Sequence, residues 1–222
     1  MSTVLFDPIK TMSKMTDTVL VAFSGGKESI VVLDLCMKYF KNVHVLFQVI
    51  VPGLDYEETI LQWYEKKYNI HITRSYGECV SEMYRYGSFR PVDLTFPLIS
   101  GTDFYNYWRC ETNSWFIASG ERIDDSLQRR AMIKKNGTID VDRGRFYPVA
   151  MWKKKEIYDY IKYHKLYLHP AQKELGFSLT PLGGRSLKWH LDNHPEDYYK
   201  IIKQFPLAGA DVIRKEVYGK NH

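Results

Sequence analysis

Short apolar runs rich in β-branched residues alternate along the chain with segments of helical periodicity. The apolar runs predict buried strands at 18–23, 43–51, 71–74, 114–119 and 146–149. Helices are predicted at 30–40, from Asp55 as N-cap, around 80–86 and at 153–164. Strands that alternate with helices form βαβ crossovers, so the pattern predicts an α/β fold: a mainly parallel sheet with helices on both faces.

The length of the chain favours one domain. Its 222 residues can form one sizeable core, and neither an internal repeat nor a low-complexity linker divides the sequence. We expect a single nucleotide-binding domain over 1–222, with a C-terminal extension at 165–222. The segment 87–111 is the least regular, and we expect it to serve as a lid or a partner surface.

Composition narrows the class of protein and its surroundings. Hydrophobic residues make up 45% of the chain and charged residues 26%, as in soluble globular proteins. No apolar run approaches the roughly 20 residues of a membrane span, and no secretory leader is recognisable, so no membrane is expected. Three widely spaced cysteines do not form a disulfide framework, which favours the cytoplasm. The net charge of +5 suits an anionic ligand and leaves nucleic acid open as a partner.

The stretch VAFSGGKES, residues 21–29, places a polar loop between the first predicted strand and the first predicted helix. In open α/β sheets, ligands bind beyond the carboxyl ends of the strands, where N–H groups at a helix N-terminus attract anions. Gly25 and Gly26 would let a phosphate approach the backbone. Hydroxyl donors come from Ser24 and Ser29, and Lys27 adds a positive charge. The alternative is an ordinary turn with a solvated lysine.

The loop is not a Walker A motif, because Val21 and Glu28 stand where that motif has glycine and Ser or Thr. It resembles the SGGxDS loop of the PP-loop ATP pyrophosphatase superfamily, with Glu28 where aspartate is usual. A second stretch, SGERIDDS followed by two arginines, resembles the G-x-R-x-D-E-S-x-x-R block of the phosphoadenylylsulfate (PAPS) reductase family. The residues on that pattern are Gly120, Arg122, Asp124, Asp125 (in place of glutamate), Ser126 and Arg129.

Two further blocks resemble the same family in the same order. Residues 147–170 resemble its P-x-x-x-W, Y-I and H-P stretch, in which Trp152 and His169 are expected to be structural. Gly53 with Glu58 and Thr59 fits the G-x-x-x-x-E-T sequence that follows the second strand. The resemblance covers roughly residues 18–170 and implies an adenine nucleotide alpha hydrolase-like, Rossmann-like fold.

The chain also departs from the family pattern. Reductases of the family end in a catalytic cysteine motif, whereas no cysteine follows Cys110 here. The three cysteines are fewer than the four that bind an iron–sulfur cluster, so we expect neither a cluster nor thiol-based reduction by this chain. Val51 and Pro52 replace an Asp-Thr pair of the family, which puts some nucleotide contacts in doubt.

The resemblance implies an ATP pyrophosphatase of the adenylyltransferase type, because family members that cleave ATP carry the SGGK lysine. Such an enzyme cleaves ATP between the α- and β-phosphates and adenylylates an acceptor, here unidentified, as in sulfur metabolism. Lys27 and Arg122 are expected to be catalytic. The expected nucleotide site comprises Ala22, Phe23, Ser24, Gly25, Gly26, Lys27, Glu28, Ser29, Gly120, Arg122, Asp125 and Arg129.

The expected cofactors are ATP and Mg²⁺, with Glu28 near the magnesium ion and no metal site made by the protein alone. Two other functions stay open. One is a PAPS or adenylylsulfate reductase that uses an external thiol, for which Cys110 is the internal candidate unless it is an inert cysteine. The other is a nucleotide-dependent binding module that acts with a partner protein, for instance on nucleic acid. For Arg122, the alternative is a surface ion pair with Asp124 or Asp125.

Overall fold

The computed structural model describes residues 3–176 and 180–218. Its strands form one six-stranded sheet in the order β3-β2-β1-β4-β6-β5. β1 is parallel to β2 and β4, β4 is parallel to β6, and β5 is antiparallel to β6. The bounds are β1 Thr18–Phe23, β2 Asn42–Val49, β3 Ile72–Tyr76, β4 Ile117–Ala118, β5 Ile139–Asp140 and β6 Arg145–Phe146. The predicted α/β fold with a mainly parallel sheet is confirmed.

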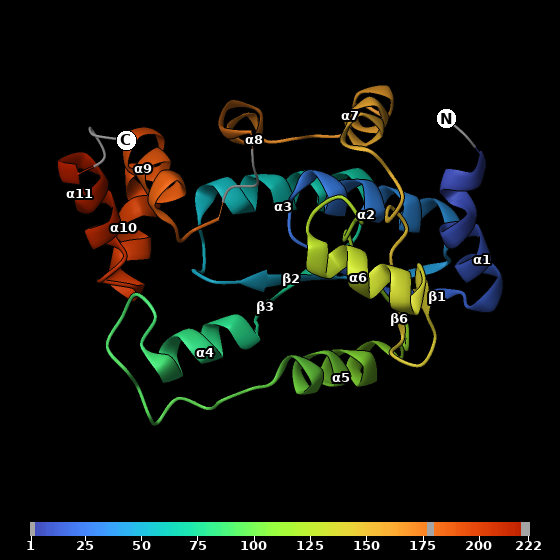
Figure 1. Ribbon diagram of the computed structural model, residues 1–222, viewed down its shortest axis with the longest axis horizontal. Helices are drawn as coiled ribbons and strands as arrows, with labels where there is room; N and C mark the ends of the chain where they lie inside the picture. Colours follow the sequence, from blue (N-terminus) through green and yellow to red (C-terminus); the bar gives the residue numbers. More distant parts are fainter. Residues whose placement is uncertain (1–2, 177–179, 219–222) are drawn as a thin grey trace. The chain divides into compact units, whose positions relative to one another are not determined.

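The chain divides into two compact units, of which the first comprises Met1–Phe47, Trp63–Arg74 and Tyr105–Leu168. Within it, α2 packs against β1, α1 and α7, and its residues 29–36 are all buried. Figure 1 shows α2 and α7 on one side of the strands of this unit and α5 on the other. The helices of this unit are η1 Thr3–Phe6, α1 Asp7–Met15, α2 Lys27–Tyr39, most of α5 Gly101–Thr112, α6 Leu127–Asn136 and α7 Lys154–Tyr163.

The second unit comprises Gln48–Gln62, Ser75–Phe104 and His169–His222. Within it, α9 packs against α10 and α11. Its helices are the first half of α3 Asp55–Tyr68, α4 Glu78–Tyr86, α8 Pro170–Leu175, α9 Gly184–Asn193, α10 Pro195–Gln204 and α11 Gly209–Tyr218. Most of the expected C-terminal extension is therefore helical, while residues 177–179 and 219–222 lie outside the described part. The single nucleotide-binding domain stays a prediction.

The start of α3 corrects one detail of the sequence analysis. Asp55 is the first residue of the helix and not its N-cap. The carboxylate of Asp197, on α10, accepts hydrogen bonds from the N–H groups of Asp55 (2.8 Å) and Tyr56 (3.2 Å). The Asp197 carboxylate therefore caps α3, because it accepts hydrogen bonds from two N–H groups that have no partner within the helix. Lys200 lies 3.2 Å from the same carboxylate and offsets its charge.

Several helices occur where none was predicted, among them α1 and the four helices α8 to α11 of the C-terminal part. Two more lie in or near the irregular segments of the sequence. Gly101–Thr112 is helical although 87–111 lacked a clear pattern, and α6 follows the second polar loop directly, with Ser126 as its N-cap. Two predicted strands are shorter than expected, because only Ile117–Ala118 and Arg145–Phe146 pair in the sheet.

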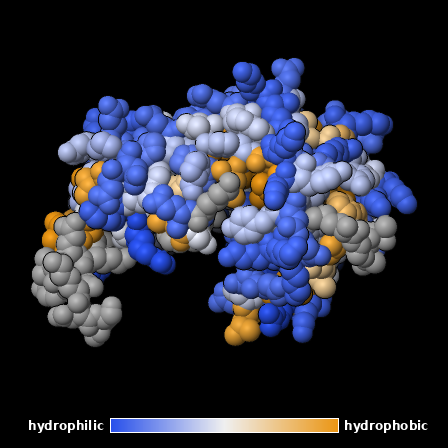
Figure 2. Space-filling model, turned by 90° about the horizontal axis from the view of Figure 1, so that it is seen from above, coloured by the Kyte–Doolittle hydropathy of each residue, from blue (hydrophilic) through white to orange (hydrophobic). Residues whose placement is uncertain are grey.

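Polar residues prevail on the surface. The face in Figure 2 is mostly hydrophilic, and its hydrophobic residues occur in small groups. In the described part of the chain, no helix has the length and apolar character that a membrane span requires.

Candidate functional site

The SGGKES loop contains the whole connection between β1 and α2. β1 ends at Phe23 and α2 begins at Lys27, so residues 24–26 connect the two and Lys27, Glu28 and Ser29 lie in the first turn of α2. Gly25 has a φ of +68°, which favours glycine. The buried Ser29 closes the loop: its Oγ accepts a hydrogen bond from the N–H of Ser24 (3.2 Å) and donates one to the carbonyl of Gly26 (2.9 Å). Ala22 and Phe23 form the end of β1 directly before it. The loop therefore presents the N-terminus of α2 at the carboxyl edge of the sheet.

The loop after β4 lies against this first turn of α2. A Cβ atom on Gly120 would lie 2.9 Å from the Cβ of Glu28, which is closer than real Cβ atoms come. It would also lie 3.1 Å from the backbone nitrogen of Ser29, a tighter contact than most real Cβ atoms make. Glycine is therefore required for this approach. Because β2 and β4 flank β1 on opposite sides, the two loops meet at the topological switch point of the sheet, where open α/β sheets bind their ligands.

One carboxylate joins the two loops electrostatically. Glu28 Oε1 lies 3.1 Å from Lys27 Nζ and 3.2 Å from Arg122 Nη2. The Lys27 and Glu28 side chains are each only 15% exposed and that of Arg122 is 8% exposed. Lys27 is therefore largely covered and ion-paired, which corrects the view of a solvated lysine. The pair of Arg122 is buried too, so it is not a surface ion pair.

Asp125 holds the other side of Arg122. Its Oδ1 lies 2.7 Å from Arg122 Nη2, and its Oδ2 accepts the backbone N–H of Arg122 at 2.9 Å. Arg122 Nη1 also donates to the carbonyl of Trp152 (3.2 Å). Arg129, in the first turn of α6, reaches Asp125 Oδ2 at 3.3 Å but stays half exposed. Asp124 pairs instead with Lys153 at 3.0 Å.

Three buried polar atoms of the second loop have no hydrogen-bond partner among the described residues. They are Ser119 Oγ, Glu121 Oε2 and Arg122 Nε. Buried polar atoms in folded proteins are nearly always paired, so such atoms call for a ligand or water. Ser119 and Glu121 were not among the predicted site residues, although both flank Gly120 in the SGER sequence.

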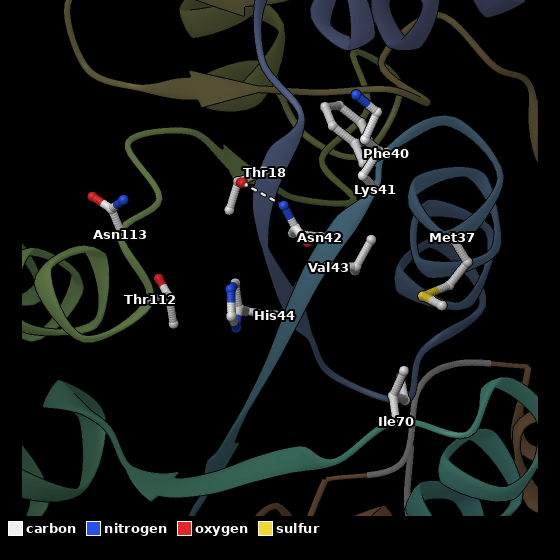
Figure 3. A pocket seen from close by; sticks show the side chains of 10 residues that line it. All are labelled: Thr18, Met37, Phe40, Lys41, Asn42, Val43, His44, Ile70, Thr112 and Asn113. Carbon is white, nitrogen blue, oxygen red and sulfur yellow. Dashed lines mark hydrogen bonds between the residues drawn. The ribbon is translucent and has the colours of Figure 1, made fainter.

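A pocket of about 560 Å³ lies at the opposite edge of the same unit. Figure 3 shows it at the start of β1 and β2, with Thr18 hydrogen-bonded to Asn42 and with His44 and Thr112 beside them. None of the candidate site residues lines it. Because ligands of open α/β sheets bind at the carboxyl ends of the strands, we place the candidate site at the two loops.

The cysteines of the chain do not come together. Cys36 is buried, Cys79 is half-buried and Cys110 is exposed, and all three are free. Among the described residues, no group of three or more His, Cys, Asp or Glu side chains could hold a metal ion. The described residues therefore offer no ligand set for a metal cluster.

Comparison with curated proteins gives one partial relative. An uncharacterized protein of Methanocaldococcus jannaschii is 44% identical over 71 residues, which are 31% of this chain and 14% of the relative. The aligned part is thus about a seventh of the length of that protein.

Several solved structures are similar in fold. The NH3-dependent NAD synthetase from Campylobacter jejuni, in complex with a nitrate ion, has a TM-score of 0.51 at 18% identity, covering 94% of this chain and 93% of its own. The PAPS reductase from Candida auris, in a phosphate complex, has a TM-score of 0.50 at 13% identity, covering 80% of this chain and 94% of its own. A U34-tRNA thiolase from Methanococcus maripaludis with its [4Fe-4S] cluster has a TM-score of 0.46 at 16% identity, covering 91% and 78%. At these identities the likenesses concern the fold alone. Those to the NAD synthetase and the PAPS reductase confirm the predicted adenine nucleotide alpha hydrolase-like fold.

The cofactor prediction is wrong. It combined ATP and Mg²⁺ with the absence of an iron–sulfur cluster, whereas the tRNA thiolase carries a [4Fe-4S] cluster.

A family model matches one segment in the N-terminal part of the chain. A model of the phosphoadenosine phosphosulfate reductase domain matches residues 18–88, which contain the whole SGGKES loop. In this segment the chain is similar to the phosphoadenosine phosphosulfate reductase domain, the domain of the family that the sequence motifs resemble.

Proposed function

We propose that the chain is an ATP pyrophosphatase of the adenylyltransferase type, which cleaves ATP between the α- and β-phosphates. An acceptor oxygen attacks the α-phosphorus, the bond from that phosphorus to the bridging oxygen breaks, and pyrophosphate leaves with the bond's electron pair. The observation that carries the proposal is the approach of Gly120 to Glu28, which brings Lys27 and Arg122 to one carboxylate at the switch point.

The SGGKES loop would bind the leaving pyrophosphate. Its serines, Ser24 and Ser29, and its glycines, Gly25 and Gly26, surround the N-terminus of α2, whose dipole favours an anion. Lys27 would stabilise the charge that develops on the leaving group, and this stabilisation lowers the barrier because it is stronger in the transition state than in the ground state.

The second loop would hold the α-phosphate or the acceptor. Arg122 and Arg129 both contact Asp125, so their guanidinium groups are held near one another. Guanidinium groups bind phosphate oxygens through paired N–H donors. Main-chain groups of Ala22 and Phe23, at the end of β1, would face the adenine.

Glu28 would act as a positioning residue. A carboxylate repels phosphate, so it is a poor direct ligand for the nucleotide. Its Oε1 lies within 3.2 Å of both Lys27 and Arg122, however, and this contact fixes the two cations before a ligand arrives. Groups that are already oriented lose less entropy when the ligand binds.

The test is mass spectrometry of the nucleotide products after incubation with ATP, divalent cations and candidate acceptors such as sulfate, a carboxylate or a nucleobase. The proposal expects pyrophosphate together with AMP or an adenylylated acceptor. ADP with inorganic phosphate would reject it. Lys154→Ala, on the exposed side of α7, is the control and should form the same products as the parent.

A further inference from the structure

Ser119, Glu121 and Arg122 each leave one buried polar atom without a partner in the part of the chain that is described. The three residues follow β4 almost consecutively, at the carboxyl edge of the sheet. Ser119 is 5% exposed and Arg122 is 6% exposed, so water reaches neither freely. An unpaired buried polar atom costs about 1–3 kcal/mol, and three of them in one loop indicate that a ligand completes their hydrogen bonds.

The strand register and the approach of Gly120 to Glu28 bring the backbone of this loop beside the SGGKES loop. Val21 pairs with Ala118, so Ser24 and Glu121 each lie three residues beyond a paired position on neighbouring parallel strands. Neighbouring strands are about 4.8 Å apart. A nucleotide whose phosphates bind at the start of α2 therefore has the second loop as its lateral neighbour.

The loop after β4 differs in chemistry from the SGGKES loop. A carboxylate, such as the side chain of Glu121 offers, accepts hydrogen bonds and repels a phosphate group. The Ser119 hydroxyl both donates and accepts. Ser119 and Glu121 together suit an uncharged ligand group that both donates and accepts a hydrogen bond. In a nucleotide, the groups of this kind that lie next to the α-phosphate are the sugar hydroxyls.

We propose that Ser119 and Glu121 bind a ribose hydroxyl of the nucleotide and so select ribonucleotides over deoxyribonucleotides. The proposal rests on the proposed function, because it assumes that an adenine nucleotide occupies the switch point. Neither residue was part of the site expected from the family motifs.

The experiment pairs variants of the protein with variants of the ligand. Dissociation constants of ATP, 2′-deoxy-ATP and 3′-deoxy-ATP are measured by calorimetry for the parent, Glu121→Ala and Ser119→Ala. One of the two deoxynucleotides should bind the parent about tenfold to a hundredfold more weakly than ATP, the range of a hydrogen bond to a charged group. Glu121→Ala should bind ATP as weakly as the parent binds that deoxynucleotide, and should no longer distinguish the two ligands.

The controls distinguish a failure of the role assigned to Glu121 from a failure of the proposed function. Glu111→Ala, at an exposed position of α5, should keep the parent's preference, and Glu121→Gln should keep part of it because an amide oxygen still accepts a hydrogen bond. If Glu121→Ala binds ATP like the parent, or still discriminates against the same deoxynucleotide, the assignment of Glu121 is overturned while ATP binding stands. If the parent does not bind ATP at all, the proposed function itself is rejected.

Discussion

Gly120 lies so close to Glu28 that a Cβ atom added to the glycine would be 2.9 Å from the Cβ of the glutamate. The two residues belong to different loops, one after β4 and one at the start of α2. Because backbone atoms of Glu28 and Ser29 are also within 3.2 Å of that Cβ, rotation of a side chain cannot relieve the contact. The joint between the two loops therefore depends on the absence of a side chain at residue 120.

Gly120→Ala should consequently destabilise the protein and weaken nucleotide binding together. Overpacking of this kind costs about 1–3 kcal/mol, which in a protein of this size lowers Tm by about 2–4 °C for each kcal/mol. Gly101→Ala is the control, since its Cβ would meet nothing nearer than 3.7 Å. Thermal melts with and without ATP check the prediction, and equal behaviour of the two variants would contradict it.

Arg129 and its neighbour Arg130 form a matched pair for the role of the second loop. Both are about half exposed, but Arg129 contacts Asp125 within the candidate site whereas Arg130 lies 3.8 Å from Asp124 outside it. Arg129→Ala should weaken ATP binding about tenfold or more, by loss of a charge-assisted hydrogen bond, with little change in Tm. Arg130→Ala should bind ATP like the parent in the same titration. The opposite order would remove Arg129 from the site.

The cysteines should differ sharply in reactivity. Cys36 is fully buried in α2 and burial raises the pKa of its thiol, whereas Cys110 is exposed. Since the thiolate is the reactive form, iodoacetamide should modify Cys110 first and Cys36 only after unfolding, as peptide mass spectrometry can show. Cys110→Ser should leave ATP binding intact. Loss of all activity in a folded Cys110→Ser protein would favour covalent sulfur chemistry instead.

Glu57, in the second unit, predicts a pH dependence of stability. Burial raises the pKa of its carboxyl from the ordinary 4.5 to about 8, and the hydroxyl of Tyr56 donates to it at 3.0 Å. Because the pKa is higher in the folded state, its contribution to stability is fully present below pH 4.5 and is lost as the pH rises through 8. The slope is at most about 1.4 kcal/mol per pH unit between these values.

Glu57→Gln stays uncharged, so the free energy of unfolding should fall less steeply with pH than in the parent. Urea unfolding at pH 5.5, 7.0 and 8.5 measures the difference between the two proteins, which should grow with pH in favour of the variant. Glu196→Gln, at an exposed position of α10, should show no such trend. A constant difference between Glu57→Gln and the parent would mean that Glu57 is ionised in the folded protein.

The SGGKES loop could be predicted from sequence as a strand-to-helix turn because its signals are local. A buried strand, a run of glycine and serine and an apolar helix follow one another within residues 18–39, so the turn between β1 and α2 is fixed by neighbouring residues. The motif around Gly120 could be matched for the same reason. The close contact of Gly120 with Glu28, however, arises from residues about 90 positions apart in the printed sequence and required the structure.

Some of the features that were missed lack an apolar pattern or depend on distant partners, although α1 and α10 were missed despite their buried apolar residues. In α6 only Ile133 is buried, so the helix shows no hydrophobic periodicity. The cap of α3 comes from Asp197, far along the chain, and no local pattern near Asp55 reveals it. The unpaired atoms of Ser119 and Glu121 could not be predicted either, because they depend on which hydrogen-bond partners the described part of the fold brings near them.

The central claim is that the SGGKES loop binds the phosphates of ATP. The most direct test compares how much ATP raises the thermal stability of Lys27→Ala and of Lys154→Ala. ATP at a hundredfold excess over its Kd should stabilise the parent and Lys154→Ala by about 2.7 kcal/mol. In Lys27→Ala, loss of a charge-assisted bond of about 1.5–3 kcal/mol should reduce this protection to roughly 1 kcal/mol or less. The melting temperature without ATP should stay within a few degrees of the parent. Full protection of Lys27→Ala, or loss of protection in Lys154→Ala, would contradict the claim.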